Sequence, residues 1–226
     1  MTVCPTAQSF AMPPGPLQEH LRLPRAAPGM RIGLYGGSFN PAHAGHRNAS
    51  LLALRRLQLD RVWWLVSPGN PLKDHSGLPS SSARVAHARE VAASNLIDVS
   101  AFEEALGTHF SIDTLAFLRR RFPEVRFVWL MGGDNLATFH LWRGWREITH
   151  MMPIAVIDRP GWTLKAPLGK AASAMRAFRK QESSATALAD MAPPAWIYLH
   201  GPRNFLSSTA LRERDENATN SADPSS

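Results

Sequence analysis

Short apolar runs alternate along this chain with longer segments in which apolar residues recur at helical spacing. The apolar runs predict buried β-strands at residues 32–35, 61–66, 97–99, 125–131, 153–157 and 196–199. The helical spacing predicts helices from about residue 43, over residues 82–93 and over residues 112–121, with Ser111 as the N-cap of the last. This alternation predicts an α/β fold with a doubly wound, mostly parallel sheet and helices on both faces. Ligands of such sheets bind beyond the carboxyl ends of the strands.

The two ends of the chain differ in composition from its middle. Residues 1–29 contain many prolines and no continuous apolar core, so they predict a disordered tail rather than a secretory signal. Residues 215–226 are mostly polar and small, which predicts a second flexible tail. The stretch between them, residues 30–214, is long enough for one well-buried domain.

Charge and cysteine content narrow the function classes only a little. The 226 residues include 25 Lys and Arg against 18 Asp and Glu, and the net charge of +7 suits polyanions such as ATP or nucleic acid without selecting either. The run Arg119-Arg120-Arg121 predicts the solvated end of a helix that packs on the sheet through its apolar neighbours. Cys4 is the only cysteine, which excludes an intrachain disulfide, and no apolar run approaches the roughly 20 residues of a membrane span. We therefore expect a cytoplasmic protein with no membrane partner.

The most informative segment follows the first predicted strand and has the sequence Gly-Gly-Ser-Phe-Asn-Pro-Ala-His-Ala-Gly-His over residues 36–46. Gly36 and Gly37 predict a tight turn at which the backbone approaches a ligand, and the next helix would present its free N–H groups to an anion. His43 and His46 lie on one face of the first helical turn, so both imidazoles could donate hydrogen bonds to phosphate. The alternatives are a plain turn or an adventitious metal pair. A hydrolytic zinc site, however, needs a third ligand, and the chain has no His-Glu-x-x-His.

Further polar residues would gather at the same edge of the sheet. Asp134 follows a glycine pair after the strand at residues 125–131, where it could accept hydrogen bonds from ribose hydroxyls or act simply as a helix N-cap. Ser208 and Thr209 begin a short predicted helix and could bind an anion, with Arg212 on the same helical face. A plain N-cap is the alternative for this second segment.

Two segments carry a resemblance to a known superfamily. Residues 36–46 resemble the first signature of the nucleotidylyltransferases, Gly-Gly-(Ser/Thr)-Phe-(Asp/Asn)-Pro-x-His-x-Gly-His, and residues 206–212 are similar to their second signature, Ile-Ser-Ser-Thr-x-(Ile/Leu)-Arg. The landmarks of one branch, the bacterial nicotinate-nucleotide adenylyltransferases, resemble residues 71–73, 110–115, 132–136, 139–142 and 159–161. The resemblance runs from about residue 30 to about residue 214 and implies the Rossmann-like nucleotidylyltransferase fold.

The resemblance implies an enzyme of class EC 2.7.7.18 that acts in NAD biosynthesis. Its substrates would be ATP and nicotinate mononucleotide, its products nicotinate adenine dinucleotide and pyrophosphate, and its cofactor Mg²⁺. The attacking phosphate is already an anion at neutral pH, so the protein need not supply a nucleophile or a strong base. Its task is to position two polyanions and to neutralise their charge.

The resemblance also implies which residues form the site. Catalytic roles would fall to His43, His46, Lys73 and Arg212, with His46 the first choice for the α-phosphate. ATP would be bound by Gly36, Gly37, Ser38, Phe39, His43, His46, Gly132, Asp134, Arg159, Ser208, Thr209 and Arg212. Nicotinate mononucleotide would be bound by Asn40, Lys73, Ser111, Trp142 and Arg143. No residue is assigned to a metal ion.

The predicted pyridine site contains one departure from the family pattern. Trp142 could stack on the pyridine ring, although an ordinary core tryptophan is the alternative. Ser111 would donate to the nicotinate carboxylate, and the chain has Phe110-Ser111 where Tyr-Thr is commoner in the family. The hydroxyl survives but the phenol is lost, which leaves the preference between acid and amide mononucleotides open.

Two other functions remain alternatives. Nicotinamide mononucleotide and phosphopantetheine adenylyltransferases share the first signature, but the Ser-Ile-Asp-Thr-Leu string at residues 111–115 and the Arg-Pro-Gly at residues 159–161 favour the nicotinate branch. A nucleic-acid-binding module would explain the positive charge, but it would also be expected to interleave aromatic residues with a basic stripe, which the sequence lacks. We expect no nucleic-acid partner, and the sequence leaves a monomer and a homo-oligomer equally open.

Overall fold

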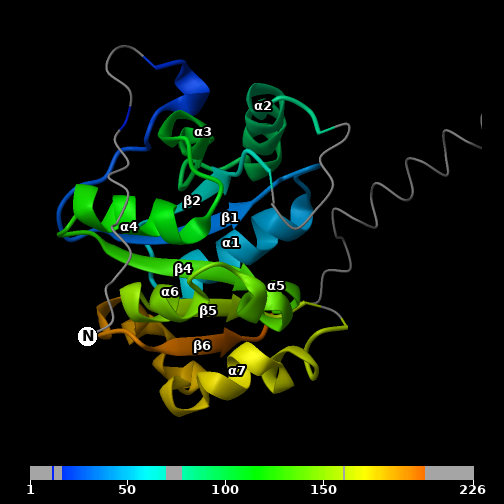
Figure 1. Cartoon of the computed structure of the whole chain (residues 1–226), viewed down its shortest axis with the longest axis vertical. Helices are drawn as coiled ribbons and strands as arrows, with labels where there is room; N and C mark the ends of the chain where they lie inside the picture. The colour runs from blue at the N-terminus through cyan, green and yellow to red at the C-terminus, as the bar shows by residue number, and fades with distance from the viewer. Residues whose placement is uncertain (1–11, 13–16, 70–77, 160, 202–226) are drawn as a thin grey trace, which may run out of the picture.

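A parallel sheet forms the centre of the protein. In this computed structural model, which describes residues 12, 17–69, 78–159 and 161–201, its strands are β1 (Arg31–Gly37), β2 (Arg61–Val66), β3 (Ile97–Ser100), β4 (Arg126–Gly132), β5 (Ile154–Ile157) and β6 (Trp196–Leu199). Their order across the sheet is β3-β2-β1-β4-β5-β6, and every neighbouring pair is parallel (Figure 1). The predicted α/β fold is confirmed, and the six predicted strands coincide with these six to within two residues at each end.

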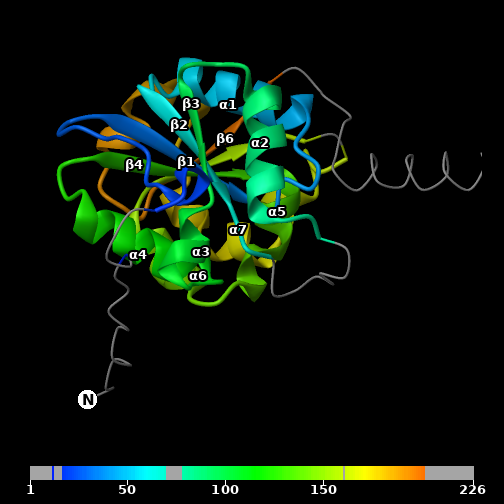
Figure 2. The ribbon, with the colours of Figure 1, turned by 90° about the horizontal axis from the view of Figure 1, so that it is seen from above.

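Helices cover both faces of the sheet (Figure 2). One face carries α1 (Ala44–Arg56), α2 (Ser81–Ala92) and the 3-10 helix η5 (Glu182–Asp190). The other face carries α3 (Phe102–Leu106), α4 (Ser111–Arg121), α5 (Gly133–Thr138), α6 (Trp145–Met151) and α7 (Lys170–Ala174). Shorter 3-10 helices are η1 (Glu19–Leu21), η2 (Phe139–Leu141), η3 (Ala166–Leu168) and η4 (Arg176–Phe178).

Strand periodicity explains why two separate cores form. Successive side chains of a strand point to opposite faces, so Tyr35 and Trp64 enter the core under α1 and α2. Their neighbours Leu34 and Trp63 enter the core on the other face. Because both faces are covered, the strands are apolar along nearly their whole length, and their burial made them predictable from sequence.

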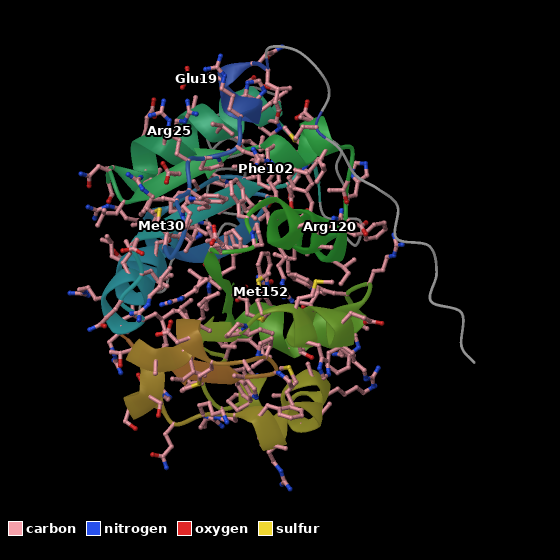
Figure 3. All side chains as sticks on the ribbon, turned by 90° about the vertical axis from the view of Figure 1, so that its left-hand side faces the viewer. Glu19, Arg25, Met30, Phe102, Arg120 and Met152 are labelled. Carbon is pink, nitrogen blue, oxygen red and sulfur yellow. The ribbon has the colours of Figure 1, made fainter. Side chains whose placement is uncertain are left out.

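The structure corrects the predicted cap of α4 and agrees with the prediction for its end. Ser111 is the first residue of α4 and not its N-cap, because Phe110 still has an extended backbone (φ −117°, ψ 128°) and occupies the cap position without a side-chain hydrogen bond. The three arginines that end α4 are exposed, as predicted, and Figure 3 shows Arg120 on this helix. The N–H groups of the first turn of α4 therefore lack a side-chain cap.

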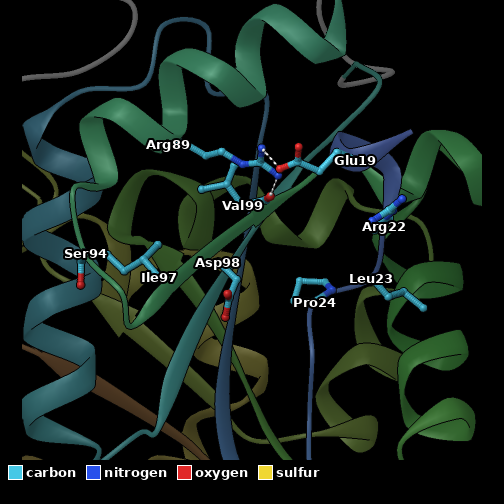
Figure 4. A pocket seen from close by; sticks show the side chains of 9 residues that line it. All are labelled: Glu19, Arg22, Leu23, Pro24, Arg89, Ser94, Ile97, Asp98 and Val99. Atoms are coloured by element: carbon cyan, nitrogen blue, oxygen red, sulfur yellow. Dashed lines mark hydrogen bonds and ion pairs between the residues drawn. The ribbon is translucent and has the colours of Figure 1, made fainter. Parts of the chain in front are cut away.

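The prediction of a disordered tail over residues 1–29 is wrong for residues 17–29. The Ser100 hydroxyl donates to the carbonyl of Arg22 at 2.6 Å, and the Ala101 N–H donates to the carbonyl of His20 at 2.7 Å. An ion pair between Glu19 and Arg89 at 2.8 Å joins this segment to α2, across a pocket of about 340 Å³ (Figure 4). Proline suppresses helix and sheet formation, but it does not prevent an extended chain from packing on an edge strand through its carbonyls.

The strand order places the site. β1 lies between β2 and β4, so the chain leaves β1 towards one side of the sheet while β4 extends the sheet on the other side. Such a topological switch point is where open α/β sheets bind ligands, beyond the carboxyl ends of the strands. Gly37 ends β1 and Gly132 ends β4 at this position. Within the described ranges, none of the helices has the length and apolarity of a membrane span.

Candidate active site

Two histidines at the N-terminus of α1 form the centre of the site. His43 is the N-cap, and its Nδ1 accepts the Gly45 N–H at 3.0 Å. His46 completes a capping box, because its Nδ1 accepts the His43 N–H at 3.2 Å. The two rings lie 3.9 Å apart between centroids, which confirms that they share one face. An Nδ1 that accepts carries no proton, so these hydrogen bonds assign the proton of each neutral imidazole to Nε2.

Both imidazoles are neutral at physiological pH. The pKa of His43 is lowered to about 4, chiefly by burial and then by the cation of Arg159, while the carboxylate of Asp134 partly opposes the shift. Burial also lowers the pKa of His46 well below its ordinary value, with His43 and Arg159 adding to the effect. Nε2 of His43 is buried and has no hydrogen-bond partner among the described residues. This position therefore presents a desolvated N–H donor that a ligand can satisfy.

The loop between β1 and α1 is held in an unusual conformation. Phe39 has a positive φ of 46°, which costs a non-glycine residue energy, and its side chain is only 2% exposed. Its ring stacks on Trp64 with centroids 4.9 Å apart and lies 4.8 Å from the ring of His46. Phe39 thus supports the imidazole that follows it, and this contact is the role that the structure gives to a residue predicted to bind ATP.

The predicted reason for the first glycine pair is wrong. We expected a tight turn at Gly36-Gly37, but both residues belong to β1 and pair with Leu65 and Val66 of β2. A Cβ on Gly36 would lie 2.6 Å from a ring carbon of Trp129. Gly36 is therefore required by the close approach of a buried indole, and the chain turns only after Gly37.

The charged side chains of Arg159 and Asp134 lie near the neutral histidines, just beyond the ends of β5 and β4. The Arg159 guanidinium donates to the Tyr35 hydroxyl at 3.1 Å, and its Nε lies 3.5 Å from Oδ1 of Asp134. A Cβ on Gly132 would lie 2.8 Å from that Nε, so glycine lets the guanidinium approach the backbone. Oδ1 of Asp134 is buried and has no hydrogen-bond partner among the described residues. The N-cap of α5 is Gly132, so the N-cap alternative for Asp134 is wrong.

The residues predicted to bind the pyridine come from two segments that the structure brings together. The Arg143 guanidinium lies over the ring of Phe110, 4.7 Å from its centroid, and 3.8 Å from Oδ2 of Asp113. Ser111, at the start of α4, lies between Phe110 and Asp113 in sequence and so shares this region. Trp142 packs edge-on against Phe139 with centroids 5.5 Å apart, and it is only partly buried. The structure therefore gives Trp142 a packing role and leaves part of it accessible.

The remaining predicted residues fall into two groups, of which only the second is described by the structure. Lys73, Ser208, Thr209 and Arg212 lie outside the described residues. Ser38 and Asn40 lie in the loop between β1 and α1, and the carbonyl of Ser38 accepts a hydrogen bond from Arg84 at 2.8 Å.

Three further residues of the site were missed from the sequence. Tyr35 gave no signal, because an aromatic residue in an apolar strand is typical of any core. Asp158 accepts from Tyr198 at 2.8 Å and from Thr163 at 3.0 Å, and so holds the segment that carries Arg159. Arg84 could have been found, since it falls on the apolar face of α2 with Val85 and Ala88 although it is charged.

No group of three or more His, Cys, Asp or Glu residues in the described part of the chain could hold a metal ion. Asp134, the carboxylate nearest the histidines among the interactions described above, is paired with Arg159. Beside phosphates, Mg²⁺ is commonly held by one or two carboxylates together with oxygens of the nucleotide and water.

Comparisons with known proteins show which proteins this chain resembles. A model of the family described as cytidylyltransferase-like matches residues 34–214. A protein of Methylorubrum extorquens (strain PA1) named "Probable nicotinate-nucleotide adenylyltransferase" is 60% identical over 185 residues, which cover 82% of this chain and 100% of that protein. Proteins with the same name from Bradyrhizobium sp. (strain ORS 278) and Brucella suis biovar 1 (strain 1330) are 55% and 51% identical, over 82% and 81% of this chain and 97% and 95% of their own lengths.

A solved structure shares the fold at low sequence identity. It is described as Plasmodium falciparum nicotinic acid mononucleotide adenylyltransferase complexed with NaAD, and it superposes with a TM-score of 0.59 at 16% identity. The match covers 81% of this chain and 83% of that one. This likeness supports the arrangement of the sheet and helices.

Proposed function

The chain belongs to the cytidylyltransferase-like family and, within it, to the nicotinate-nucleotide adenylyltransferases, and from this premise we propose that it is a cytoplasmic enzyme of NAD biosynthesis. It transfers the adenylyl group of ATP to nicotinate mononucleotide and releases pyrophosphate and nicotinate adenine dinucleotide. The observation that carries this proposal is the 60% identity to a relative of that name along the relative's whole length. The site at the switch point is consistent with it, because its donors suit phosphate.

The histidines act as neutral donors to the phosphates of ATP. The unpartnered Nε2–H of His43 gains a charge-assisted hydrogen bond when a phosphate oxygen enters the site. His46, whose proton is also assigned to Nε2, donates to the α-phosphate, where the phosphate of nicotinate mononucleotide attacks in line. Preorganised donors of this kind stabilise charge that grows on the phosphoryl oxygens without having to reorient. Bound phosphates also raise the pKa of both imidazoles, opposite to the effect of burial.

Arg159 and Asp134 bind other parts of ATP near the end of β4. Arg159 keeps its position through Tyr35 and Asp134, and its cation attracts the triphosphate. Oδ1 of Asp134 is ion-paired with Arg159 but has no hydrogen-bond donor among the described residues, and it accepts a hydrogen bond from a ribose hydroxyl of ATP. The family resemblance adds Ser208, Thr209 and Arg212 for the leaving phosphates and Lys73 between the two substrates.

The pyridine of the acceptor binds where α4 begins. The uncapped N–H groups of the first turn of α4 and the Ser111 hydroxyl provide donors for a carboxylate. Arg143 adds positive charge from above Phe110, and the accessible part of Trp142 contacts the ring. These groups favour the acid over the neutral amide.

Mg²⁺ is the expected cofactor, and it is carried on the phosphates of ATP. Mg²⁺ beside phosphates usually takes most of its ligands from the nucleotide and from water. When bound, it neutralises phosphate charge. The protein's own residues orient the two substrates and exclude water between them.

Product analysis tests this proposal. The protein is incubated with ATP and Mg²⁺ and, in separate reactions, with nicotinate mononucleotide, nicotinamide mononucleotide or phosphopantetheine, and the products are separated by chromatography while pyrophosphate is assayed. We expect the deamido dinucleotide to form fastest. Product with phosphopantetheine alone, or no pyrophosphate with any acceptor, would contradict the proposal.

A matched pair of tryptophan variants tests the pyridine site. Trp142→Phe should raise the KM for nicotinate mononucleotide several-fold while leaving the KM for ATP nearly unchanged. Trp145→Phe, three residues along and at the start of α6, is the control. Equal effects of the two substitutions would remove Trp142 from the substrate site.

A further inference from the structure

Arg84 is a buried cation that belongs to none of the predicted site residues. It lies in the first turn of α2, only 4% exposed, on the face that carries Val85 and Ala88. Arginine is almost never buried to this degree unless its donors are satisfied. Its hydrogen bonds therefore indicate its structural role.

In the described structure, all the side-chain hydrogen bonds of Arg84 go to backbone carbonyls of loops at the carboxyl edge of the sheet. Nη1 donates to Ser38 at 2.8 Å and to Ser67 at 2.7 Å, and Nε donates to Pro79 at 3.0 Å. Ser38 directly follows β1, Ser67 directly follows β2, and Pro79 precedes Ser80, the N-cap of α2. One guanidinium thus joins the ends of three neighbouring segments.

The charge of Arg84 is balanced in an unusual way. No carboxylate of the described residues forms a hydrogen bond or ion pair with it, although the more distant Glu104 stabilises the cation somewhat. Burial lowers the pKa of the guanidinium, which remains charged. Isolating a cation from water is unfavourable unless its hydrogen bonds compensate, and here three carbonyls provide that compensation. An apolar side chain would fill the same space but would leave these carbonyls without the donor.

A second residue of α2 bonds the same loop. His87, one turn after Arg84, contacts the carbonyl of Ala42 at 3.1 Å through Nε2. Residues three apart share a helical face, so α2 holds the loop at Ser38 and again at Ala42. Phe39, with its positive φ, lies between Ser38 and Ala42, and His43 directly follows Ala42. The position of the His43 imidazole therefore depends on a loop that is fixed at both ends by α2.

We propose that Arg84 is a positioning residue for adenylyl transfer, which fixes Ser38 against the end of β2 and so holds the Nε2–H of His43 where the phosphates bind. The inference rests on the proposed function for its kinetic part. It assigns Arg84 no contact with substrate. The geometry of its fork, and not only its charge, is what the loop requires.

Three variants separate geometry from charge. Arg84→Met removes the hydrogen bonds and should lower kcat by about 100-fold, because small displacements of catalytic groups have effects of that order, while the KM for ATP changes much less. Arg84→Lys keeps the charge but lacks the planar fork, and it should remain about tenfold below the unsubstituted protein. Arg89→Met on the same helix is the control, since Arg89 is exposed and pairs with Glu19 rather than with the loop. Circular dichroism confirms that each variant is folded at the assay temperature.

Hydrogen exchange gives a readout that does not need activity. In Arg84→Met, or in Arg84→Lys if the Met variant does not fold, amides of residues 38–43 should exchange faster while those of β5 and β6 do not change. Wild-type turnover in Arg84→Lys, turnover of Arg84→Met within threefold of wild type, or unchanged exchange over residues 38–43 would each overturn the inference. If the unsubstituted protein forms no dinucleotide, the proposed function fails, and the exchange measurement still decides the role of Arg84.

Discussion

Two substitutions of His43 separate its roles in stability and in catalysis, because its two ring nitrogens form different interactions. Nδ1 caps α1 by accepting the Gly45 N–H, whereas Nε2 carries a buried donor without a partner. In His43→Asn, the amide oxygen can take the place of Nδ1, and Asn is a strong N-cap, so stability should change little. His43→Ala loses the cap and should unfold about 1 kcal/mol more easily. Urea unfolding of both variants measures this difference.

Both substitutions remove the Nε2–H, so both should lower turnover alike. Loss of one preorganised donor to a developing charge lowers kcat by about 10²–10³-fold, or about 3–4 kcal/mol of transition-state stabilisation. The assay is pyrophosphate release at saturating ATP and nicotinate mononucleotide. If His43→Asn kept kcat within tenfold of wild type, Nε2 would not be a donor to the reacting phosphates, and the interpretation of its missing partner would be wrong.

The same residue predicts an acid-sensitive fold. The folded-state pKa of His43 is about 4, below its ordinary value of 6.5, so the unfolded chain binds more protons between these values. The contribution of His43 to the free energy of unfolding is therefore full above about pH 6.5, and it decreases by about 3 kcal/mol as the pH falls towards 4. Urea unfolding at pH 7 and pH 4.5 should show a smaller loss in His43→Asn than in wild type. An equal loss would show that His43 is not buried in its neutral form.

Three further substitutions test other parts of the account. Gly36→Ala should destabilise the protein by about 1–3 kcal/mol through overlap with Trp129, seen as a lower Tm, and an unchanged Tm would contradict the packing reason for this glycine. Burial raises the pKa of Glu103 to about 7, so its contribution to the free energy of unfolding is full below about pH 4.5 and is lost as the pH rises through 7. In urea unfolding, the stability of Glu103→Gln relative to wild type should therefore increase by up to about 3 kcal/mol between pH 4.5 and pH 8. A difference that does not change with pH would refute this. Arg159→Met should raise the KM for ATP at least tenfold and leave the KM for nicotinate mononucleotide nearly unchanged, whereas equal rises in both would contradict a specific role at the triphosphate.

Much of the fold could be predicted because the sheet is buried on both faces. Strands that are apolar along nearly their whole length, such as β2 and β4, stand out in the sequence, and their alternation with helices indicates the class of fold. The packing of residues 17–29 could not be predicted, since it depends on carbonyls that accept hydrogen bonds from Ser100 and Ala101 rather than on a local pattern. Long-range backbone contacts of this kind leave no periodic signal.

The candidate site was predictable where a motif is contiguous. His43, His46 and Asp134 belong to short sequence motifs that follow β1 and β4 at the edge of the sheet. The roles of individual residues were harder to predict. Gly36 contacts an indole of β4 that is far away in sequence, and Arg84 donates hydrogen bonds to three segments that precede its helix along the chain. Such roles arise from tertiary contacts, which one chain without its fold does not reveal.

A crystal structure of the protein with nicotinate adenine dinucleotide bound would show whether the histidines contact the phosphates. We expect the dinucleotide to lie across the switch point between β1 and β4, with a phosphate oxygen within about 3.2 Å of Nε2 of His43. Asp134 should contact the adenosine ribose, and the pyridine carboxylate should face the first turn of α4. A dinucleotide bound elsewhere, or one whose phosphates contact neither His43 nor His46, would contradict the account.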